Sequence, residues 1–303
     1  MTMTETKHIT VLLHEAVDLL DISKDSVVID ATLGAGGHAK QILVRLGKAG
    51  KYLGIDADPT AILAAESKLK GEATILLKNA NFSQVKEVSD EYQLEPDAIL
   101  ADLGWRSEQF ADAKRGFSFQ VDGPLLMTYG EPANYTFTAY DIVNDWEESS
   151  IADVIFGYGE ERFARRIAKA IIAARAKTEI KTTLQLVEII QSAVPGWYRR
   201  GRLHPATKTF QALRIAVNDE LGTLKTFIAD GFSILKPGGR MAIITFHSLE
   251  DRLVKHSFAA LKHDQQALLV NKKPITPSEV EIKSNPRARS AKLRIIEKIE
   301  NHE

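Results

Sequence analysis

The chain has 303 residues, of which 44% are hydrophobic and 26% charged, and its formal net charge is −1 at pH 7. This composition is that of an ordinary folded protein, and the length favours two structural units over one. Cysteine is absent, which excludes disulfides, thiolate metal sites and cysteine nucleophiles. The first ten residues are polar, and no apolar run reaches the ~20 residues of a membrane helix. We therefore expect a cytoplasmic protein without a membrane partner.

The first third of the chain alternates between predicted strands and helices. Short apolar runs that predict strands occur at 27–30, 52–56, 74–77 and 98–102. A glycine-rich turn follows the first run and leads into a helix-compatible segment that ends at Leu46. After the second run, Asp58 and Pro59 fit the N-cap and first position of another helix. This order is typical of a parallel α/β sheet.

The pattern changes at about Ser107, where helical periodicity replaces the strands. Helices are predicted at 151–155, 160–174, 183–193 and 205–235. Strand character returns at 241–246, after a Lys-Pro-Gly-Gly turn, and alternating apolar residues at 291–298 predict a late edge strand. The simplest arrangement is a doubly wound, mostly parallel sheet with an inserted helical domain. The sheet domain would comprise residues 1–106 and 204–303, and the insertion residues 107–203.

Acidic residues end several of the predicted strands. In open α/β sheets, ligands bind at the carboxyl ends of the strands, near the point where the strand order reverses. Asp30 is expected to cap the turn that follows it, and Asp56 is placed to accept hydrogen bonds from ribose hydroxyls. The glycines of residues 34–37 would let backbone N–H groups approach a ligand. These features suit any adenosine cofactor, including a nicotinamide dinucleotide.

Three details favour S-adenosylmethionine over a dinucleotide. The turn reads Gly-Ala-Gly-Gly-His, whereas a dinucleotide site needs Gly-x-Gly-x-x-Gly to seat a pyrophosphate. The Lys-Pro-Gly-Gly turn resembles the one before the fifth strand of many class I methyltransferases. Asp102 ends the fourth strand, where amino-methylating members of that class keep polar groups against the target nitrogen.

Several long segments resemble the RsmH (MraW) family, methyltransferases that modify a cytidine of small-subunit ribosomal RNA on its exocyclic nitrogen. The most specific are residues 204–215, His-Pro-Ala-Thr-Lys-Thr-Phe-Gln-Ala-Leu-Arg-Ile, and 246–252, Phe-His-Ser-Leu-Glu-Asp-Arg. Further matches begin at His8, Thr32, Gly54, Asn81, Asp102, Arg115, Tyr158 and Asn285. The resemblance spans nearly the whole chain. It implies the class I methyltransferase fold and methyl transfer from S-adenosylmethionine to the N4 atom of a cytidine in ribosomal RNA of the small subunit.

The resemblance also implies roles for individual residues. Gly36, Gly37 and His38 would form the turn beside the methionine part of the cofactor, Asp56 would hold the ribose, and Phe82 would flank the adenine. Asp102 and Gln109 would complete the pocket. Asp102 is also the expected catalytic residue, orienting the target nitrogen.

The resemblance implies that the inserted domain helps to bind RNA. The sequence leaves the oligomeric state open, and a homodimer is one of the possibilities. Basic clusters with phosphate-binding character occur at 197–204, with two aromatic residues, and at 285–294. The expected RNA contacts are Arg106, Arg115, Arg199, Arg200, Arg202, Lys208, Arg214, Arg287 and Arg289. His247, Glu250 and Asp251 are expected to cap a helix, and no metal site is predicted.

The chain departs from the family pattern in two segments. The family usually reads Gly-Pro-Leu-Asp-Met-Arg-Met where this chain has Gly-Pro-Leu-Leu-Met-Thr-Tyr, so that Leu126 and Thr128 replace an acid and an arginine. The other segment is the family's Asp-Leu-Gly-x-Ser-Ser, which reads Asp-Leu-Gly-Trp-Arg-Ser at residues 102–107, so that Arg106 replaces a serine. Two hypotheses therefore remain: an active methyltransferase, and a catalytically weak or inactive RNA-binding assembly factor that retains the cofactor pocket.

Overall fold

The computed structural model describes residues 9–103 and 113–300 and divides into two compact units. The sheet unit contains residues 1–104 and 221–303, and the helical unit contains residues 105–220. The expected insertion ended at residue 203, whereas the structure places 204–220 with the helical unit as well. The reason is that α11 (Thr207–Asn218) packs against α7 (Glu148–Gly159), where a Cβ at Gly159 would lie 2.6 Å from the carbonyl oxygen of Lys208.

The described part of the sheet unit forms a seven-stranded sheet in the order β3-β2-β1-β4-β5-β7-β6. Its strands are β1 (Val27–Asp30), β2 (Lys51–Asp56), β3 (Thr74–Asn79), β4 (Ala98–Asp102), β5 (Arg240–Thr245), β6 (Ala267–Leu269) and β7 (Lys292–Lys298). Strands β1 to β5 pair in parallel, and β7 runs antiparallel to both β5 and β6. The predicted mostly parallel, doubly wound sheet is therefore confirmed.

The prediction that residues 291–298 form an edge strand is wrong. Strand β7 lies between β5 and β6, and the short β6 takes the edge. Leu293 and Ile295 enter one apolar core while Ile296 enters the core on the other face. A strand of three residues such as β6 is too short to show a period-2 pattern, so its position outside β7 was not visible in the sequence.

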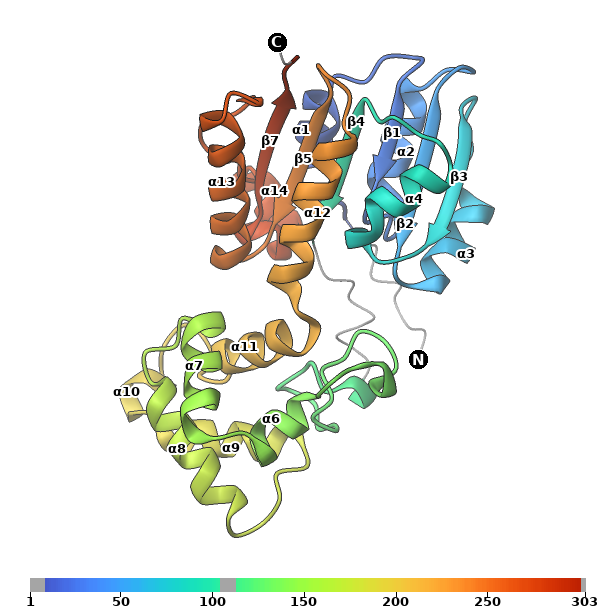
Figure 1. Ribbon diagram of the computed structural model, residues 1–303. Coiled ribbons are helices and arrows are strands. Elements are labelled where there is room, and N and C mark those ends of the chain that lie inside the picture. Colours follow the sequence, from blue (N-terminus) through green and yellow to red (C-terminus); the bar gives the residue numbers. More distant parts are fainter. Residues whose placement is uncertain (1–8, 104–112, 301–303) are drawn as a thin grey trace. The chain divides into compact units, whose positions relative to one another are not determined.

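Helices cover both faces of the sheet (Figure 1). One face packs against α1 (Leu13–Leu19), α2 (Gly37–Arg45) and α3 (Pro59–Lys68), and the other against α4 (Val85–Glu91), α12 (Glu220–Ile234) and α13 (Ser248–His263). Neighbouring strand residues alternate between the two cores, as Val28 and Ile29 do in β1. Shorter elements are η1 (Phe82–Gln84), α14 (Glu279–Ser284) and η4 (Pro286–Ser290). Burial on both faces explains why the strands read as continuous apolar runs.

The helical unit has an aliphatic core of its own. Its elements are η2 (Ala113–Arg115), η3 (Pro132–Asn134), α6 (Ala139–Asp145), α7, α8 (Ala164–Arg175), α9 (Thr183–Ala193), α10 (Gly196–Arg199) and α11. Ile142, Ile151, Ile167, Leu186 and Leu213 are fully buried together in this core. Burial of such side chains contributes about 1.5–3 kcal/mol each, enough to hold the helices as one body.

Helix boundaries were predicted unevenly. The Asp58 N-cap is confirmed, because its Oδ1 atom accepts the N–H of Thr60 at 2.8 Å. The helix expected at 160–174 begins at Ala164 instead, since Glu160 has φ +50° and ends α7. The helix expected at 205–235 is likewise broken at Asp219, where φ is +45°. Of the helices that the structure describes, none combines the length and apolar character needed to cross a membrane.

Candidate functional site

The turn between β1 and α2 lies at the carboxyl end of the sheet. Gly34 and Gly36 adopt positive φ angles of 52° and 77°, a conformation that glycine reaches without steric cost. Gly36 also donates its N–H to the carbonyl oxygen of Leu33 and serves as the N-cap position of α2. Within this turn, Ala35 alone carries a side chain, a single methyl group, so the backbone of residues 34–37 is open to close approach of a ligand.

Gly37, the first residue of α2, packs against a residue that is distant in sequence. A Cβ atom at Gly37 would lie 1.7 Å from Oγ1 and 2.9 Å from Cβ of Thr10. Thr10 therefore determines that residue 37 must be glycine, and sequence analysis did not single it out. Its signal was its place in the family-like segment that begins at His8, but the contact itself is tertiary and has no local signature.

We expect Gly37→Ala to lower the free energy of unfolding by about 1–3 kcal/mol, because the added methyl group overpacks the contact with Thr10. Urea unfolding measures this loss. The matched control is Gly157→Ala in α7, where a Cβ would meet no described heavy atom within 4 Å and alanine should stabilise the helix by about 0.5–1 kcal/mol. Adding Thr10→Gly should restore part of the loss. A double variant as unstable as Gly37→Ala would contradict the assignment.

Asp56 ends β2 and is fixed by the backbone around it. Its Oδ2 atom accepts the N–H of Gly34 at 2.7 Å, and its Oδ1 atom accepts the N–H of Asp58 at 2.8 Å. The carboxylate therefore joins the glycine turn to the start of α3. A carboxylate has about four lone-pair positions, more than the two that these bonds occupy.

Asp102 ends β4, on the other side of β1 from Asp56. Its N–H donates to Oγ1 of Thr32 at 2.6 Å, and its Oδ2 atom lies 3.8 Å from Nδ1 of His38. The exposed fraction is 15% for the Asp102 side chain and 6% for that of His38. The structure thus brings together the predicted residues Gly36, Gly37, His38, Asp56 and Asp102 at the carboxyl ends of β1, β2 and β4.

Phe82 is the first residue of η1, which follows β3. Its half-buried ring meets Phe227 of α12 edge to face, with centroids 5.4 Å apart and planes at 75°. Asn81 and Gln84 form a capping box that fixes this short helix. The ring is therefore held by the core on one side while part of it remains exposed.

Asp30 is fully buried behind the glycine turn. Its Oδ1 atom accepts the N–H of Thr32 at 3.2 Å, which confirms the predicted turn cap, and its Oδ2 atom accepts the hydroxyl of Tyr52 at 3.0 Å. Burial raises the pKa of Asp30 to about 7, against the lowering effect of these two hydrogen bonds, while the charge of Asp56 raises it further. The same burial raises the pKa of Tyr52 well above its usual value.

The raised pKa of Asp30 predicts how stability changes with pH. In the unfolded chain the carboxyl group loses its proton near pH 3.8, whereas in the folded protein it keeps the proton up to about pH 7. Its contribution to stability is therefore complete below pH 3.8 and is lost as pH rises through 7. Relative to the wild type, Asp30→Asn should gain stability from pH 4 to 7, by at most about 1.4 kcal/mol per pH unit. Urea unfolding across this range measures the difference, and parallel curves would contradict the shift.

The predicted helix start after β5 is confirmed. His247 is the N-cap of α13 and forms a capping box with Glu250, whose Oε2 atom accepts the N–H groups of Phe246 and His247. Asp251 pairs with Arg294 at 2.7 Å and with Lys292 at 2.8 Å, both from β7. These acids thus anchor α13 to the sheet.

The predicted RNA contacts occupy different environments. Arg214 forms a two-bond ion pair with Glu220, at 2.7 and 3.0 Å, and Arg115 donates to the carbonyl oxygens of Thr128 and Tyr129. These two arginines therefore brace the helical unit. Lys208 donates to the carbonyl oxygen of Glu160. The exposed predicted RNA contacts are Arg199, Arg200, Arg202, Arg287 and Arg289. Arg106 and the predicted cofactor residue Gln109 lie outside the described residues.

The strand order 3-2-1-4-5-7-6, with an antiparallel β7 and a glycine turn after β1, is that of the class I methyltransferases, enzymes that use S-adenosylmethionine. The glycine turn, Asp56 and Asp102 lie at the carboxyl ends of β1, β2 and β4, the end of an open α/β sheet at which ligands bind. Residues 5–299 match the MraW methylase family, and the chain belongs to this family.

Relatives span nearly the full chain. The protein named ribosomal RNA small subunit methyltransferase H of Acetivibrio thermocellus is 47% identical over 314 residues, covering 97% of this chain and 100% of the relative. The protein of the same name from Synechococcus elongatus is 46% identical over 293 residues, covering 96% and 95%. Among solved structures, an rRNA methylase from Streptococcus thermophilus matches with a TM-score of 0.46 and 13% identity, covering 97% of this chain and 99% of that one.

Proposed function

We propose that the protein is a cytoplasmic methyltransferase that moves a methyl group from S-adenosylmethionine to the exocyclic N4 of a cytidine in small-subunit ribosomal RNA. The observation that carries this proposal is the meeting of an open glycine turn with Asp56 and Asp102 at one edge of the sheet. Family membership and the names of the full-length relatives support ribosomal RNA as the substrate.

The residues at this edge fit S-adenosylmethionine. The turn has positive-φ glycines but lacks the spacing that seats a pyrophosphate, and Asp56 ends β2 with a carboxylate, a group that accepts hydrogen bonds from ribose hydroxyls. Gly36, Gly37 and His38 would hold the methionine part, and Phe82 would flank the adenine. Asp102 and Gln109 would close the pocket. When bound, the cofactor supplies an electrophilic methyl group on a sulfonium.

Asp102 is assigned the catalytic role. The amino nitrogen of cytosine is a poor nucleophile, because its lone pair is delocalised into the ring. A carboxylate that accepts one N–H bond would favour the pyramidal, nucleophilic form and would hold the nitrogen in line with the methyl group. The backbone bond to Thr32 and the buried His38 beside it fix Asp102 in place for this task.

A second candidate function is that of an RNA-binding assembly factor with little or no activity. It is favoured by Leu126 and Thr128, which replace the acid and the arginine of the family pattern. Thr128 is buried and its hydroxyl donates to the carbonyl oxygen of Gly130, so neither position carries an ionisable group. In both candidates the helical unit would recognise RNA.

The test is transfer of labelled methyl from S-adenosylmethionine to purified small subunits that lack the modification, followed by nucleoside analysis. Labelled N4-methylcytidine is the expected product. Cofactor binding without transfer would favour the assembly factor, and a protein that does not bind the cofactor would overturn both candidates.

A further inference from the structure

An exposed tryptophan in the helical unit is held by its neighbours in a fixed orientation. The side chain of Trp197 in α10 is 57% exposed, whereas tryptophan side chains are on average largely buried. Its ring meets Tyr198 edge to face at 5.8 Å and 85°, and Phe163 at 6.0 Å and 64°. Tyr198 is itself anchored, because its hydroxyl donates to the fully buried carboxylate of Glu161. The contacts with Tyr198 and Phe163 therefore set the orientation of the indole ring.

A guanidinium group accompanies the indole. The Cζ atom of Arg162 lies 4.6 Å from the centroid of Trp197, 5.1 Å from that of Phe163 and 5.2 Å from that of Tyr198. Arg162 remains exposed despite these contacts. An arginine stacked against aromatic rings is pre-organised, so it loses little side-chain entropy when a further planar or anionic group binds.

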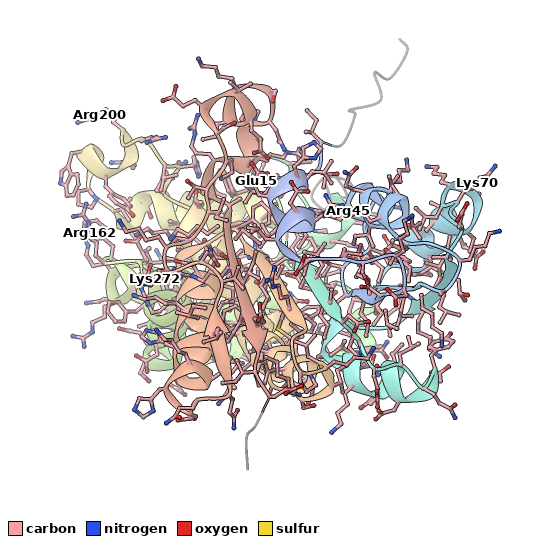
Figure 2. All side chains as sticks on the ribbon, turned by 90° about the horizontal axis from the view of Figure 1, so that it is seen from above. Glu15, Arg45, Lys70, Arg162, Arg200 and Lys272 are labelled. Carbon is pink, nitrogen blue, oxygen red and sulfur yellow. The ribbon has the colours of Figure 1, made fainter. Side chains whose placement is uncertain are left out.

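The segment that carries Trp197 is basic. Residues 194–203 contain three arginines and no acidic residue. A Cβ at Gly196 would lie 3.5 Å from a guanidinium nitrogen of Arg200 and 3.9 Å from one of Arg199, so both side chains fold back toward the residue that precedes Trp197. Figure 2 shows Arg162 and Arg200 on the same side of the helical unit. The exposed cations at or next to these rings are Arg162, Arg166, Arg199, Arg200 and, in the same segment, Arg202.

We propose that this surface, which we term the Trp197 platform, binds single-stranded RNA by stacking an unpaired base on Trp197 while the arginines contact the flanking phosphates. A flat exposed ring suits any base, because every base has a π-face, and the cations suit the backbone. A duplex keeps its bases stacked on each other and cannot use the ring. The platform deepens the proposed function, because it names the form of RNA that the helical unit recognises.

The experiment measures the dissociation constant of the full chain for a labelled, unstructured ten-nucleotide RNA and for the same strand in a duplex. Trp197→Ala should weaken binding of the single strand at least about fivefold and leave binding of the duplex within about twofold. Trp197→Phe, which keeps a ring, should retain most of the affinity. Phe156→Ala removes another exposed aromatic of the same unit and should change neither constant.

Salt dependence separates the ring from the charges. Arg162→Gln should reduce the slope of log affinity against log salt by about 0.7, the value for one phosphate contact to a single strand, whereas Trp197→Ala should leave the slope unchanged. Lys169→Gln, an exposed cation further along α8, should leave both the slope and the affinity unchanged. Unfolding curves establish that each variant is folded, and Trp197→Phe carries the test if the alanine variant is not.

Single-strand affinity unchanged by Trp197→Ala, or equal losses for single strand and duplex, would overturn the platform. The first result would indicate that the surface binds a protein partner and not RNA. Failure of the proposed function is distinct from this. A wild-type protein that transfers no methyl group but binds single strands through Trp197 would remove the enzyme and keep the platform, whereas normal transfer with Trp197-independent binding would do the reverse.

Discussion

Replacing Asp102 with alanine is expected to lower kcat for methyl transfer by about 100- to 1,000-fold, the size of effect seen when a pre-organised group that stabilises a transition state is removed. Asp102 ends β4 with its N–H bonded to Thr32, so the side chain is held at the site whether or not substrate is present. Asp102→Asn keeps one carbonyl oxygen that can accept an N–H bond, and its loss should be smaller. Single-turnover transfer at saturating cofactor and RNA measures the chemical step directly.

Asp97, which directly precedes β4, provides a matched control for Asp102 at the other end of that strand. Asp97 accepts the N–H of Val27 at 2.7 Å and pairs with Lys236 at 3.0 Å, far from the glycine turn along β4. Asp97→Asn should cost about 1 kcal/mol of stability and leave kcat unchanged. An Asp102→Ala variant with normal kcat, or one that loses activity solely through a raised KM for RNA, would contradict the catalytic assignment.

The parts of the fold that were predictable from the sequence have local causes. Strands β1, β2 and β4 are short apolar runs that each end in an aspartate. The start of α3 is indicated by two adjacent residues, Asp58 as the N-cap and Pro59 as the first helical residue. What escaped prediction depends on distant partners or on single backbone angles. The predicted break between the helices at 151–155 and 160–174 lies a few residues later in the structure, because the positive φ of Glu160 ends α7 there. The order of β6 and β7 depends on pairing between segments that are more than 20 residues apart.

The candidate site was predictable in composition but not in its internal bonding. The spacing of Asp56 indicated a ribose acceptor, whereas its two bonds to Gly34 and Asp58 appear in the folded chain alone. Charge alone did not distinguish basic residues that have partners within the fold. Arg214 and Arg115 resemble the other basic candidates in sequence, yet the fold uses Arg214 in an ion pair with Glu220 and Arg115 on backbone carbonyl groups. The Trp197 platform, in contrast, combines a recognised basic cluster with Arg162, which lies 35 residues earlier and was not assigned a role.

Asp56→Ala is expected to weaken S-adenosylmethionine binding by about 10- to 100-fold. A hydrogen bond to a charged group contributes about 1.5–3 kcal/mol, and each 1.4 kcal/mol corresponds to a factor of ten. Titration calorimetry with the cofactor measures the change. Asp58→Ala is the matched control, because Asp58 bonds Thr60 through its side chain and Asp56 through its backbone N–H. It should lose about 1 kcal/mol of helix-cap stability and keep its affinity for the cofactor.

A loss of affinity in Asp56→Ala has two physical causes that must be separated, because Asp56 also ties the glycine turn to the start of α3. S-adenosylhomocysteine and its 2′-deoxy and 3′-deoxy analogues provide the separation. If Asp56 accepts the ribose hydroxyls, the wild-type protein should bind at least one deoxy analogue about tenfold or more weakly than the parent ligand, and Asp56→Ala should bind all three about equally. If Asp56 acts through the turn alone, its removal weakens all three ligands by the same factor and the preference for ribose persists. That result would leave Asp56 a positioning residue and move ribose recognition to another group at the carboxyl end of the sheet.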